Sequence, residues 1–365
     1  MSRRGENIYK RSDGRWEGRY ISSRNAFGKA VYRSVYAPTY GEVKTKLKKC
    51  QSEQSVPCNA GAAYSFGFWA DSWLLTVKMK CKISTYNKYK NLYNSYIYSE
   101  ISTLEINKIN FFTVQNIMLV NIRLSPKTRN DILCVIKQVL DYAEINGCKS
   151  NINLKNICVR QENREMRVLT LEEQSRFADF LLSDSDLCKT GVYLCLYTGL
   201  RIGELCALKY ENISFEKGIL SVRKTMQRVQ IENGPYKTKV IITEPKSRNS
   251  VRDIPLPKRL TELLLKQYGG MESDDYILTG KNDNFIEPRL LEYRFKKYVK
   301  SCKLEDVNFH ALRHTFATRC IEYGFDVKTL SELLGHVNVN ITLNRYIHSS
   351  IELKRVNMEK LCEIM

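Results

Sequence analysis

The first part of the chain alternates between apolar and basic positions. In the segment NIYKRSDGRWEGRYISSRNAFGKAVYRSVYA, aromatic or β-branched side chains alternate with Lys and Arg, and Asp13-Gly14 and Phe27-Gly28 interrupt the alternation. A period of two is typical of strands with one buried face, and such glycine pairs mark turns. A short basic stretch with helical character follows, TYGEVKTKLKKC. The pattern predicts a small three-stranded sheet with one helix.

The middle of the chain repeats its apolar residues every three or four positions. This spacing runs through FWADSWLLTVK, KISTYNKYKNLYNSYIYSEI and TRNDILCVIKQVLDYAEING, and Gly147 follows the third stretch as a helix-ending residue. The small, polar segment 52–63 precedes it and is typical of a linker. The spacing predicts an all-helical domain over residues 64–155.

The second half begins after another linker, near residues 156–169. Thr170 and Glu173 form a capping box that predicts the start of a helix. Beyond it the pattern predicts a helix over 191–209, strands between 218 and 256, and helices up to the end. Gly234-Pro235 and the Arg248-Asn249 region are the predicted turns between the strands.

A chain of 365 residues is too long for one compact core, so these patterns describe separate domains. They predict an α+β multidomain protein. Residues 1–58 form a small three-stranded β-sheet plus helix, residues 64–155 an all-helical domain, and residues 165–365 a mostly helical domain with a small antiparallel sheet.

The charge of the chain indicates a polyanionic partner. The formal net charge is +19, and residues 1–60 hold 13 Lys and Arg against 5 Asp and Glu. A strong excess of basic residues is typical of nucleic-acid binding, so we expect the basic face of the N-terminal sheet to contact DNA rather than only solvent.

A membrane surface is the other polyanion that the charge would suit. The most apolar run, residues 109–122, is too short for a bilayer and contains Asn and Gln. The N-terminal residues show no apolar signal sequence. We therefore expect no membrane partner and a cytoplasmic protein that acts on nucleic acid.

The 12 cysteines are scattered along the sequence. They form no CxxC pair and no Cys/His cluster with ligand spacing, and several lie in apolar helical patterns, such as Cys195, Cys206 and Cys320. Reduced, mostly buried thiols explain this usage best. The sequence predicts no metal site and no cofactor.

Two stretches in the second half place a cation where an anion can bind. In TGLRIGELCALKY, Gly199 precedes Arg201 at a predicted helix start, where free backbone N–H groups attract anions. In ITEPKSRNSVRDIPL, Lys246 lies at the bend of a predicted hairpin, where it would suit a general acid if neighbouring cations lowered its pKa. Taken alone, each of these residues is better explained as a solvated cation at the surface.

Two further stretches carry histidine and tyrosine. In NFHALRHTFATRCIEYG, His310 and Arg313 lie three residues apart and project from one face near a helix start, whereas His314 points elsewhere and is expected to be structural. The stretch LLGHVNVNITLNRYIH follows DVKTLSE, where Asp326 is the expected N-cap of a helix that ends at Gly335, so His336 lies at a helix end. Tyr346 follows on a short helix.

Together the four stretches resemble the tyrosine recombinases, or phage integrases. The resemblance rests on TGLRxGEL, PKx₄VRDIPL, HxxRHTFAT, LLGH and YxH in this order, over about residues 165–350. The basic sheet and the helical middle resemble the three-domain integrases of conjugative transposons and temperate phages. Ala311 departs from the usual Asp or Gly of the family, at a position outside the chemistry.

The resemblance implies a role for six residues. Tyr346 would be the nucleophile that forms a 3′-phosphotyrosine, and Arg201 and Arg313 would clamp the phosphate oxygens. His310 would take or share the tyrosine proton, and His336 would donate a hydrogen bond to the phosphate. Lys246 would protonate the leaving 5′-oxygen, and Glu204 would support the site. His348 is expected to lie outside the catalytic set.

The resemblance also implies the partners. These are double-stranded DNA with core-type and arm-type sites, a homotetramer on DNA, and an excisionase or DNA-bending protein, with neither metal nor ATP. Whether segment 349–365 packs on its own domain or on a neighbouring subunit stays open. A type IB topoisomerase-like enzyme would share the chemistry but differs in motif context. A non-catalytic, sequence-specific DNA-binding protein would explain the charge but not the six residues in family order.

Overall fold

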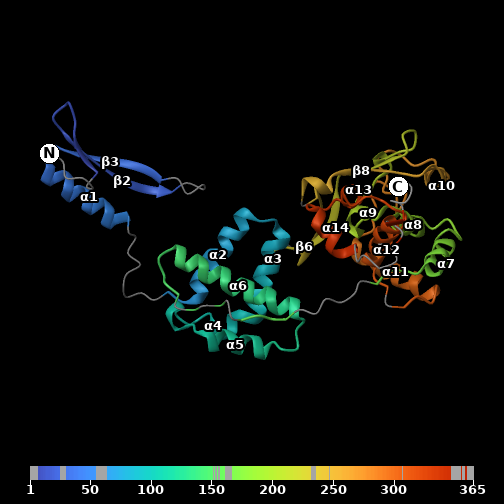
Figure 1. Cartoon of the computed structure of the whole chain (residues 1–365), viewed down its shortest axis with the longest axis horizontal. Helices are drawn as coiled ribbons and strands as arrows, with labels where there is room; N and C mark the ends of the chain where they lie inside the picture. The colour runs from blue at the N-terminus through green and yellow to red at the C-terminus, as the bar shows by residue number, and fades with distance from the viewer. Residues whose placement is uncertain are drawn as a thin grey trace. The chain divides into compact units, whose positions relative to one another are not determined.

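The computed structural model describes most of the chain, in two compact units, Met1–Gln161 and Glu162–Met365 (Figure 1). The described residues are 7–24, 30–54, 64–150, 152, 154, 157–160, 167–231, 236–245, 247–305, 307–346, 355, 358 and 359. The finer division into domains 1–58, 64–155 and 165–365 stays a prediction. The predicted turns at Phe27-Gly28 and Gly234-Pro235 lie outside the described residues.

The N-terminal sheet is antiparallel, with strand order β1-β2-β3. Its elements are β1 (Ile8–Lys10), β2 (Trp16–Arg24), β3 (Ala30–Ala37) and the following helix α1 (Tyr40–Gln54). One face of the sheet packs on α1, where Ile8, Ala37 and Val43 form a small core. Gly18 lies in this face, and a Cβ atom there would approach Val43 to 2.8 Å. The glycine therefore lets the helix lie close against β2.

The middle of the chain is all-helical among its described residues, as predicted. Its helices are α2 (Phe66–Lys80), α3 (Ile83–Leu92), the π-helical η1 (Tyr93–Ile97), α4 (Tyr98–Ile101), the 3-10 turn η2 (Ile106–Lys108), α5 (Phe111–Val120) and α6 (Pro126–Ile145). Side-chain caps at Ser65, Asn110 and Ser125 begin three of them. Gly147 follows α6 with φ 93°, which confirms it as a helix-ending residue.

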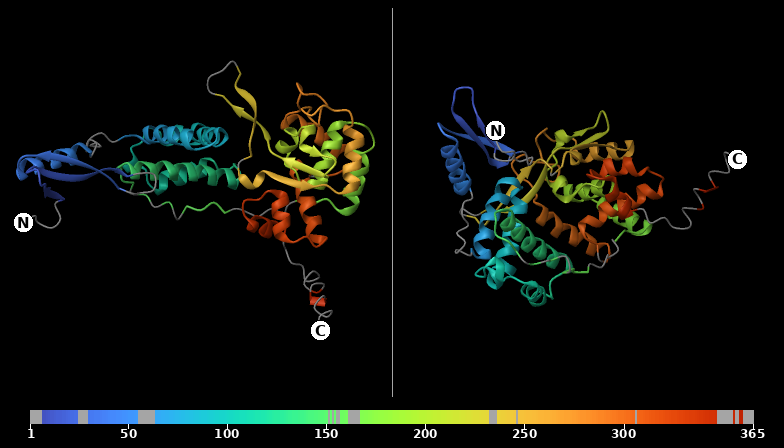
Figure 2. Two further views of the ribbon diagram at one scale, coloured as in Figure 1. Left: turned by 90° about the horizontal axis from the view of Figure 1, so that it is seen from above. Right: turned by 60° about the vertical axis from the view of Figure 1, so that its left-hand side comes forward.

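The second unit is mostly helical, with small antiparallel sheets, so the predicted fold class is confirmed (Figure 2). Its helices are α7 (Leu171–Leu181), α8 (Leu187–Thr198), α9 (Ile202–Cys206), η4 (Tyr210–Asn212), η5 (Arg248–Ser250), α10 (Lys258–Tyr268), α11 (Pro288–Ser301), α12 (Phe309–Glu322), α13 (Val327–Leu334) and α14 (Val339–Tyr346). Its strands are β4 (Ile213–Ser214), β5 (Ile219–Val222), β6 (Thr225–Gln230), β7 (Thr238–Thr243) and β8 (Arg252–Pro255).

These strands form a sheet of order β4-β5-β8 and a separate hairpin of β6 and β7. The capping box of Thr170 and Glu173 begins α7, as predicted. In the part of the chain that the structure describes, we find no helix long and apolar enough to cross a membrane.

Two left-handed glycines end the helices that lead into the candidate site. The single helix predicted over 191–209 is wrong, because α8 ends at Gly199 with φ 66° and α9 begins only after Arg201. Gly335 ends α13 with φ 64°, as predicted. A Cβ atom at Gly335 would lie 2.9 Å from the carbonyl oxygen of Asn249, so the end of α13 is packed tightly against the segment that precedes β8.

Candidate active site

Arg201 lies at the start of α9, directly after the break at Gly199-Leu200. Its side chain is about one-third exposed, and its Nη1 donates to Glu204 at 2.7 Å. The Glu204 carboxylate also accepts the backbone N–H of Arg201 at 3.0 Å, which fixes the first turn of this five-residue helix. The outer part of the guanidinium remains open to solvent and to a ligand.

Arg313, in the second turn of α12, is only 2% exposed. Its Nη1 donates to the carbonyl of Gly199 at 2.8 Å, and its Nη2 donates to that of Leu334 at 2.6 Å. Burial, followed by the nearby charge of Arg201, lowers the pKa of Arg313. The group stays a cation at neutral pH, because a guanidinium titrates far above that range.

The C-terminal end of α13 gathers three guanidinium groups. Each of three consecutive carbonyl oxygens accepts a hydrogen bond from a different arginine. The pairs are Arg252 Nε with Leu333 (2.6 Å), Arg313 Nη2 with Leu334 (2.6 Å) and Arg201 Nη2 with Gly335 (3.3 Å). The last carbonyls of a helix lack intrahelical donors and form the negative end of its dipole, so they suit cations.

Glu204 is the carboxylate within this group of cations. It is 3% exposed and accepts from Arg201 and from both Nη atoms of Arg252, at 3.1 and 2.9 Å. Burial alone raises the pKa of Glu204, but the hydrogen bonds and charge of Arg252 and the charge of Arg201 lower it overall. One carboxylate among three arginines leaves a net positive site, which suits a phosphate.

His336 follows Gly335 and is 8% exposed. Its Nδ1 lies 2.8 Å from the hydroxyl of Thr342, and Asn249 donates to its carbonyl at 3.3 Å. Burial, together with the charges of Arg313 and Arg201, lowers the pKa of His336 to about 3. The imidazole is therefore neutral at pH 7 in the absence of an anion.

Tyr346 is the last residue of α14 and is 9% exposed. Its hydroxyl lies 2.8 Å from Nδ1 of His314, and the ring of His310 meets that of His314 edge-on at 4.5 Å. Burial raises the pKa of Tyr346, and the charges of Arg313, Arg345 and other nearby arginines act in the opposite direction. Burial and the neighbouring charges also lower the pKa of His314 to about 4, so its ring is neutral at pH 7.

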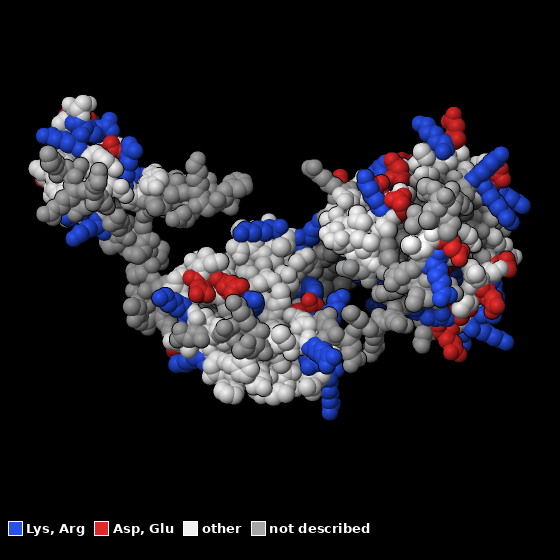
Figure 3. All heavy atoms as spheres, in the orientation of Figure 1, with Lys and Arg blue, Asp and Glu red and all other residues white. Residues whose placement is uncertain are grey.

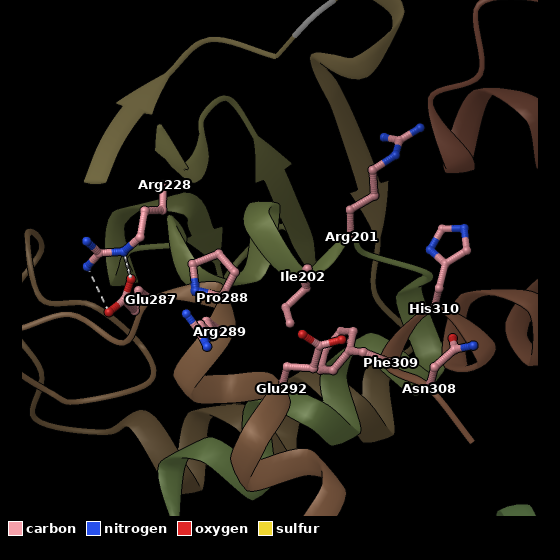
Figure 4. A pocket seen from close by; sticks show the side chains of 10 residues that line it. All are labelled: Arg201, Ile202, Arg228, Glu287, Pro288, Arg289, Glu292, Asn308, Phe309 and His310. Atoms are coloured by element: carbon pink, nitrogen blue, oxygen red, sulfur yellow. Dashed lines mark hydrogen bonds and ion pairs between the residues drawn. The ribbon is translucent and has the colours of Figure 1, made fainter. Parts of the chain in front are cut away.

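A pocket of about 710 Å³ opens beside Arg201 and His310. Figure 4 shows these two residues on one side of it and the ion pair of Arg228 with Glu287 on the other. The apolar side chain of Ile202 lies between them. The pocket gives a ligand access to the exposed edge of the arginine and histidine group.

The comparison with known proteins agrees with this geometry. The sequence profile of the phage integrase family matches residues 167–352. A protein called tyrosine recombinase XerC-like, from Caldanaerobacter subterraneus subsp. tengcongensis, is 30% identical over 93% of this chain and 94% of its own length. The chain belongs to the phage integrase family. The ICEBs1 integrase of Bacillus subtilis is also similar, at 24% identity over 89% of both chains.

Solved structures show the same fold. The integrase of transposon Tn1549, in complex with transposon right end DNA, has a TM-score of 0.66 at 22% identity, over 82% of this chain and 99% of that chain. A lambda integrase tetramer bound to a Holliday junction has a TM-score of 0.58 at 17% identity, over 95% and 97%. The likeness covers both units of this integrase-family chain.

The structure brings most of the predicted site residues of this tyrosine recombinase together. Arg201, Arg313 and His336 meet at the end of α13, and His310 shares a pocket with Arg201. Tyr346 joins this group through His314. Lys246, the remaining predicted residue, lies outside the described residues, as do His348 and nearly all of segment 349–365.

Two residues of the group were misjudged or missed in the sequence. The prediction that His314 points elsewhere is wrong, because successive helix positions are only about 100° apart and α14 packs on that side of α12. Arg252 appeared only as a motif letter in VRDIPL. Its apolar neighbours Val251 and Ile254 suggested a strand, which it begins, and gave no sign of a buried charge.

The open face of the N-terminal sheet also carries charged side chains, and Figure 3 shows Lys and Arg side chains gathered on this part of the chain. Arg11, Arg19 and Ser34 donate to Glu17 at 2.7–2.9 Å. These bonds lower the pKa of Glu17 to about 2. The ring of Tyr36 lies beside them, under the guanidinium of Arg11 at 5.7 Å. This face of the three-stranded sheet offers basic and aromatic groups.

Acidic and sulfur ligands do not gather in a metal-binding group anywhere in the described ranges. Five cysteines of the described part of the chain are buried, namely Cys188, Cys195, Cys206, Cys302 and Cys320.

Proposed function

We propose that this member of the phage integrase family is a site-specific DNA recombinase that integrates and excises a mobile element. The observation that carries the proposal is the Tyr346 hydroxyl, held 2.8 Å from His314 and near the charges of the buried Arg313 and the partly exposed Arg201. The names of its relatives support a mobile element, since they include the ICEBs1 integrase and the transposase from transposon Tn916 of Enterococcus faecalis, 28% identical over 53% of this chain.

The reaction begins with attack by the Tyr346 oxygen on a DNA phosphorus. A phosphorus–oxygen bond to the tyrosine forms, the bond to the 5′-oxygen breaks, and a 3′-phosphotyrosine with a free 5′-hydroxyl results. A free tyrosine with a pKa of about 10 is ionised to roughly one part in a thousand at neutral pH, so attack requires a proton acceptor. His310, which is exposed beside His314, takes or shares this proton, and the hydrogen bond between His314 and the tyrosine hydroxyl holds the nucleophile in place.

The arginines stabilise the charge that develops on the phosphate. Arg201 and Arg313 donate to the non-bridging oxygens through the N–H groups that are not bonded to acceptors within the protein. His336 donates a further hydrogen bond to the phosphate. Their positions are fixed before DNA arrives, so little reorganisation is needed in the transition state. Lys246 protonates the departing 5′-oxygen.

The phosphotyrosine conserves the energy of the phosphodiester, so rejoining needs neither ATP nor a metal. Attack by a 5′-hydroxyl of a second duplex completes strand exchange. Resemblance to the family, which includes a lambda integrase tetramer bound to a Holliday junction, supports a homotetramer on core-type DNA sites. By the same resemblance the N-terminal sheet contacts arm-type sites, an excisionase or DNA-bending protein assists, and the protein acts in the bacterial cytoplasm.

A nicked suicide substrate that carries the core site tests the proposal. The short 5′-hydroxyl fragment diffuses away after cleavage, so wild-type protein should accumulate as a covalent DNA adduct on a denaturing gel. Tyr346→Phe should bind the same DNA without forming the adduct. Cleavage should be unchanged in EDTA.

Three results would contradict the proposal, each in its own way. Equal trapping by Tyr346→Phe would reject this nucleophile, and loss of cleavage in EDTA would favour a metal-dependent nuclease. DNA binding by the wild type with no adduct on any core site would favour a non-catalytic DNA-binding protein.

A further inference from the structure

Arg252, at the start of β8, differs from the other two arginines of the site. Its side chain is 5% exposed. Four of its five N–H groups are used within the protein: Nε donates to Leu333, Nη1 to Glu204 and to the carbonyl of Ser250, and Nη2 to Glu204. With its donors used in this way, Arg252 is placed to hold other groups rather than to bind a phosphate.

The partners of Arg252 are the groups that fix the predicted phosphate ligands. The Glu204 carboxylate accepts hydrogen bonds from both Nη atoms of Arg252. It also accepts from the side chain and from the backbone N–H of Arg201. The Leu333 carbonyl belongs to the end of α13, where the next two carbonyls accept from Arg313 and Arg201. Arg252 therefore touches both supports of the arginine group.

The packing around Gly335 strengthens this link. A Cβ atom at Gly335 would lie 3.1 Å from Cδ of Arg252 and 3.1 Å from Cα of Ser250, so the Arg252 stem lies directly under the left-handed turn. That turn presents the His336 imidazole. A shift of Arg252 would move the turn, the histidine and the carbonyls together, because close-packed interiors transmit displacements.

We propose that Arg252 is a positioning residue for strand cleavage, which sets Arg201, Arg313 and His336 at the spacing a phosphate requires. This proposal rests on the proposed recombinase function. The positive charges of Arg201 and Arg313 repel each other. Glu204 and the carbonyl end of α13 compensate for this repulsion, and Arg252 fixes the positions of that carboxylate and that helix end. Arg252 acts through these groups and does not contact DNA.

A general contribution to folding is the other explanation for a buried arginine. Buried ion pairs are weak evidence for stability, since their desolvation cost offsets much of the attraction. The bidentate fork of Arg252 on Glu204 instead supplies directional geometry, which lysine cannot reproduce. Arg252→Lys therefore removes the geometry and keeps the charge.

The test compares Arg252→Lys with Arg319→Lys in the full chain on the nicked core-site substrate. Arg319 is the matched control, because it is also largely buried and donates to a carboxylate (Glu322) and to a backbone carbonyl (Leu169, 2.6 Å). Arg252→Lys should slow adduct formation by about 100-fold, the effect of a small misplacement of reacting groups. DNA affinity should change little, and Arg319→Lys should cleave near the wild-type rate.

A second substrate separates positioning from folding. A methylphosphonate at the scissile position removes one non-bridging charge, so its cleavage depends less on a precise arginine clamp. The ratio of wild-type to Arg252→Lys rates should shrink towards one on this substrate. Glu204→Gln, which keeps the packing, should show the same dependence on substrate and add little to Arg252→Lys in the double variant.

The outcomes are distinguishable. An equal rate loss for Arg252→Lys on both substrates, or no loss at all, would overturn the positioning role while wild-type cleavage still supported the proposed function. Absence of an adduct with wild-type protein would reject both proposals. If Arg252→Lys fails to fold, the cleavage rates of Glu204→Gln test the positioning role. An equal rate loss on both substrates overturns that role, and a loss restricted to the phosphodiester substrate supports it.

Discussion

The arginines near the N-terminal sheet and the arginines of the site in the second unit differ in exposure and in the partners they bind. Arg11, Arg15 and Arg19 are 45–62% exposed and pair with carboxylates of near neighbours in sequence. Arg252 and Arg313 are buried, and the carbonyls they bind belong to residues up to 114 positions away. The first group forms a charged surface, whereas the second holds distant segments of the chain together.

The energetic consequence differs in the same way. An exposed ion pair contributes little to folding, because water and salt screen it. A buried guanidinium that satisfies carbonyls cannot be removed without leaving those carbonyls unpaired, which costs free energy. Substitutions of the buried arginines in the second unit should therefore change the unfolding free energy strongly, and substitutions of the exposed arginines near the N-terminal sheet should change it little.

The largest expected effect is that of Arg313→Met on the stability of the second unit. The change leaves the carbonyls of Gly199 and Leu334 without donors, so we expect a loss of about 2–4 kcal/mol of unfolding free energy. Differential scanning calorimetry of the full chain measures the loss. Arg15→Met, the exposed control, should leave the transitions unchanged, and an equal shift for both variants would refute the contrast.

Acid should destabilise the second unit at a pH where most proteins are unaffected. The pKa values of His314 and His336 are lowered from 6.5 to about 4 and about 3 in the folded protein. Below pH 6.5 and down to these lowered pKa values, the unfolded chain therefore binds more protons than the folded one. Stability is then complete above pH 6.5 and falls as the pH drops towards 4. The unfolding temperature should decrease by several degrees from pH 7 to pH 5.

The control for this prediction is His314→Gln, which retains a polar group but does not titrate. Its unfolding temperature should depend less steeply on pH than that of the wild type. Parallel curves for the two proteins would show that His314 does not contribute to the acid sensitivity.

The smallest expected effect concerns the exposed face of the N-terminal sheet. Arg19→Gln should weaken binding to duplex DNA modestly and reduce the slope of log affinity against log salt by about one. Binding titrations at several KCl concentrations measure the slope. Arg19→Lys keeps the charge and should keep the slope; if Arg19→Gln also keeps it, this face does not contact phosphate.

Most of the fold could be predicted from the sequence, because its signals are local. The alternation over β1–β3, the capping box at Thr170 and Glu173, and the end of α13 at Gly335 each depend on neighbouring residues alone. The helix predicted over 191–209 missed the break at Gly199, although the predicted helix start at Arg201 is confirmed. There the apolar pattern continues through the glycine, and the left-handed turn depends on packing, since a Cβ atom at Gly199 would lie 2.6 Å from the ring of Phe316.

The sequence by itself determined the family, the basic charge of the chain and the candidates for attack and phosphate binding, because motifs and composition are read residue by residue. The tertiary structure alone decided that His314 faces Tyr346 and that Arg252 lies beneath Gly335. Those relations depend on how α12, α13, α14 and β8 pack. Which distant side chains meet depends on contacts between segments far apart in the chain, and no local pattern encodes those contacts.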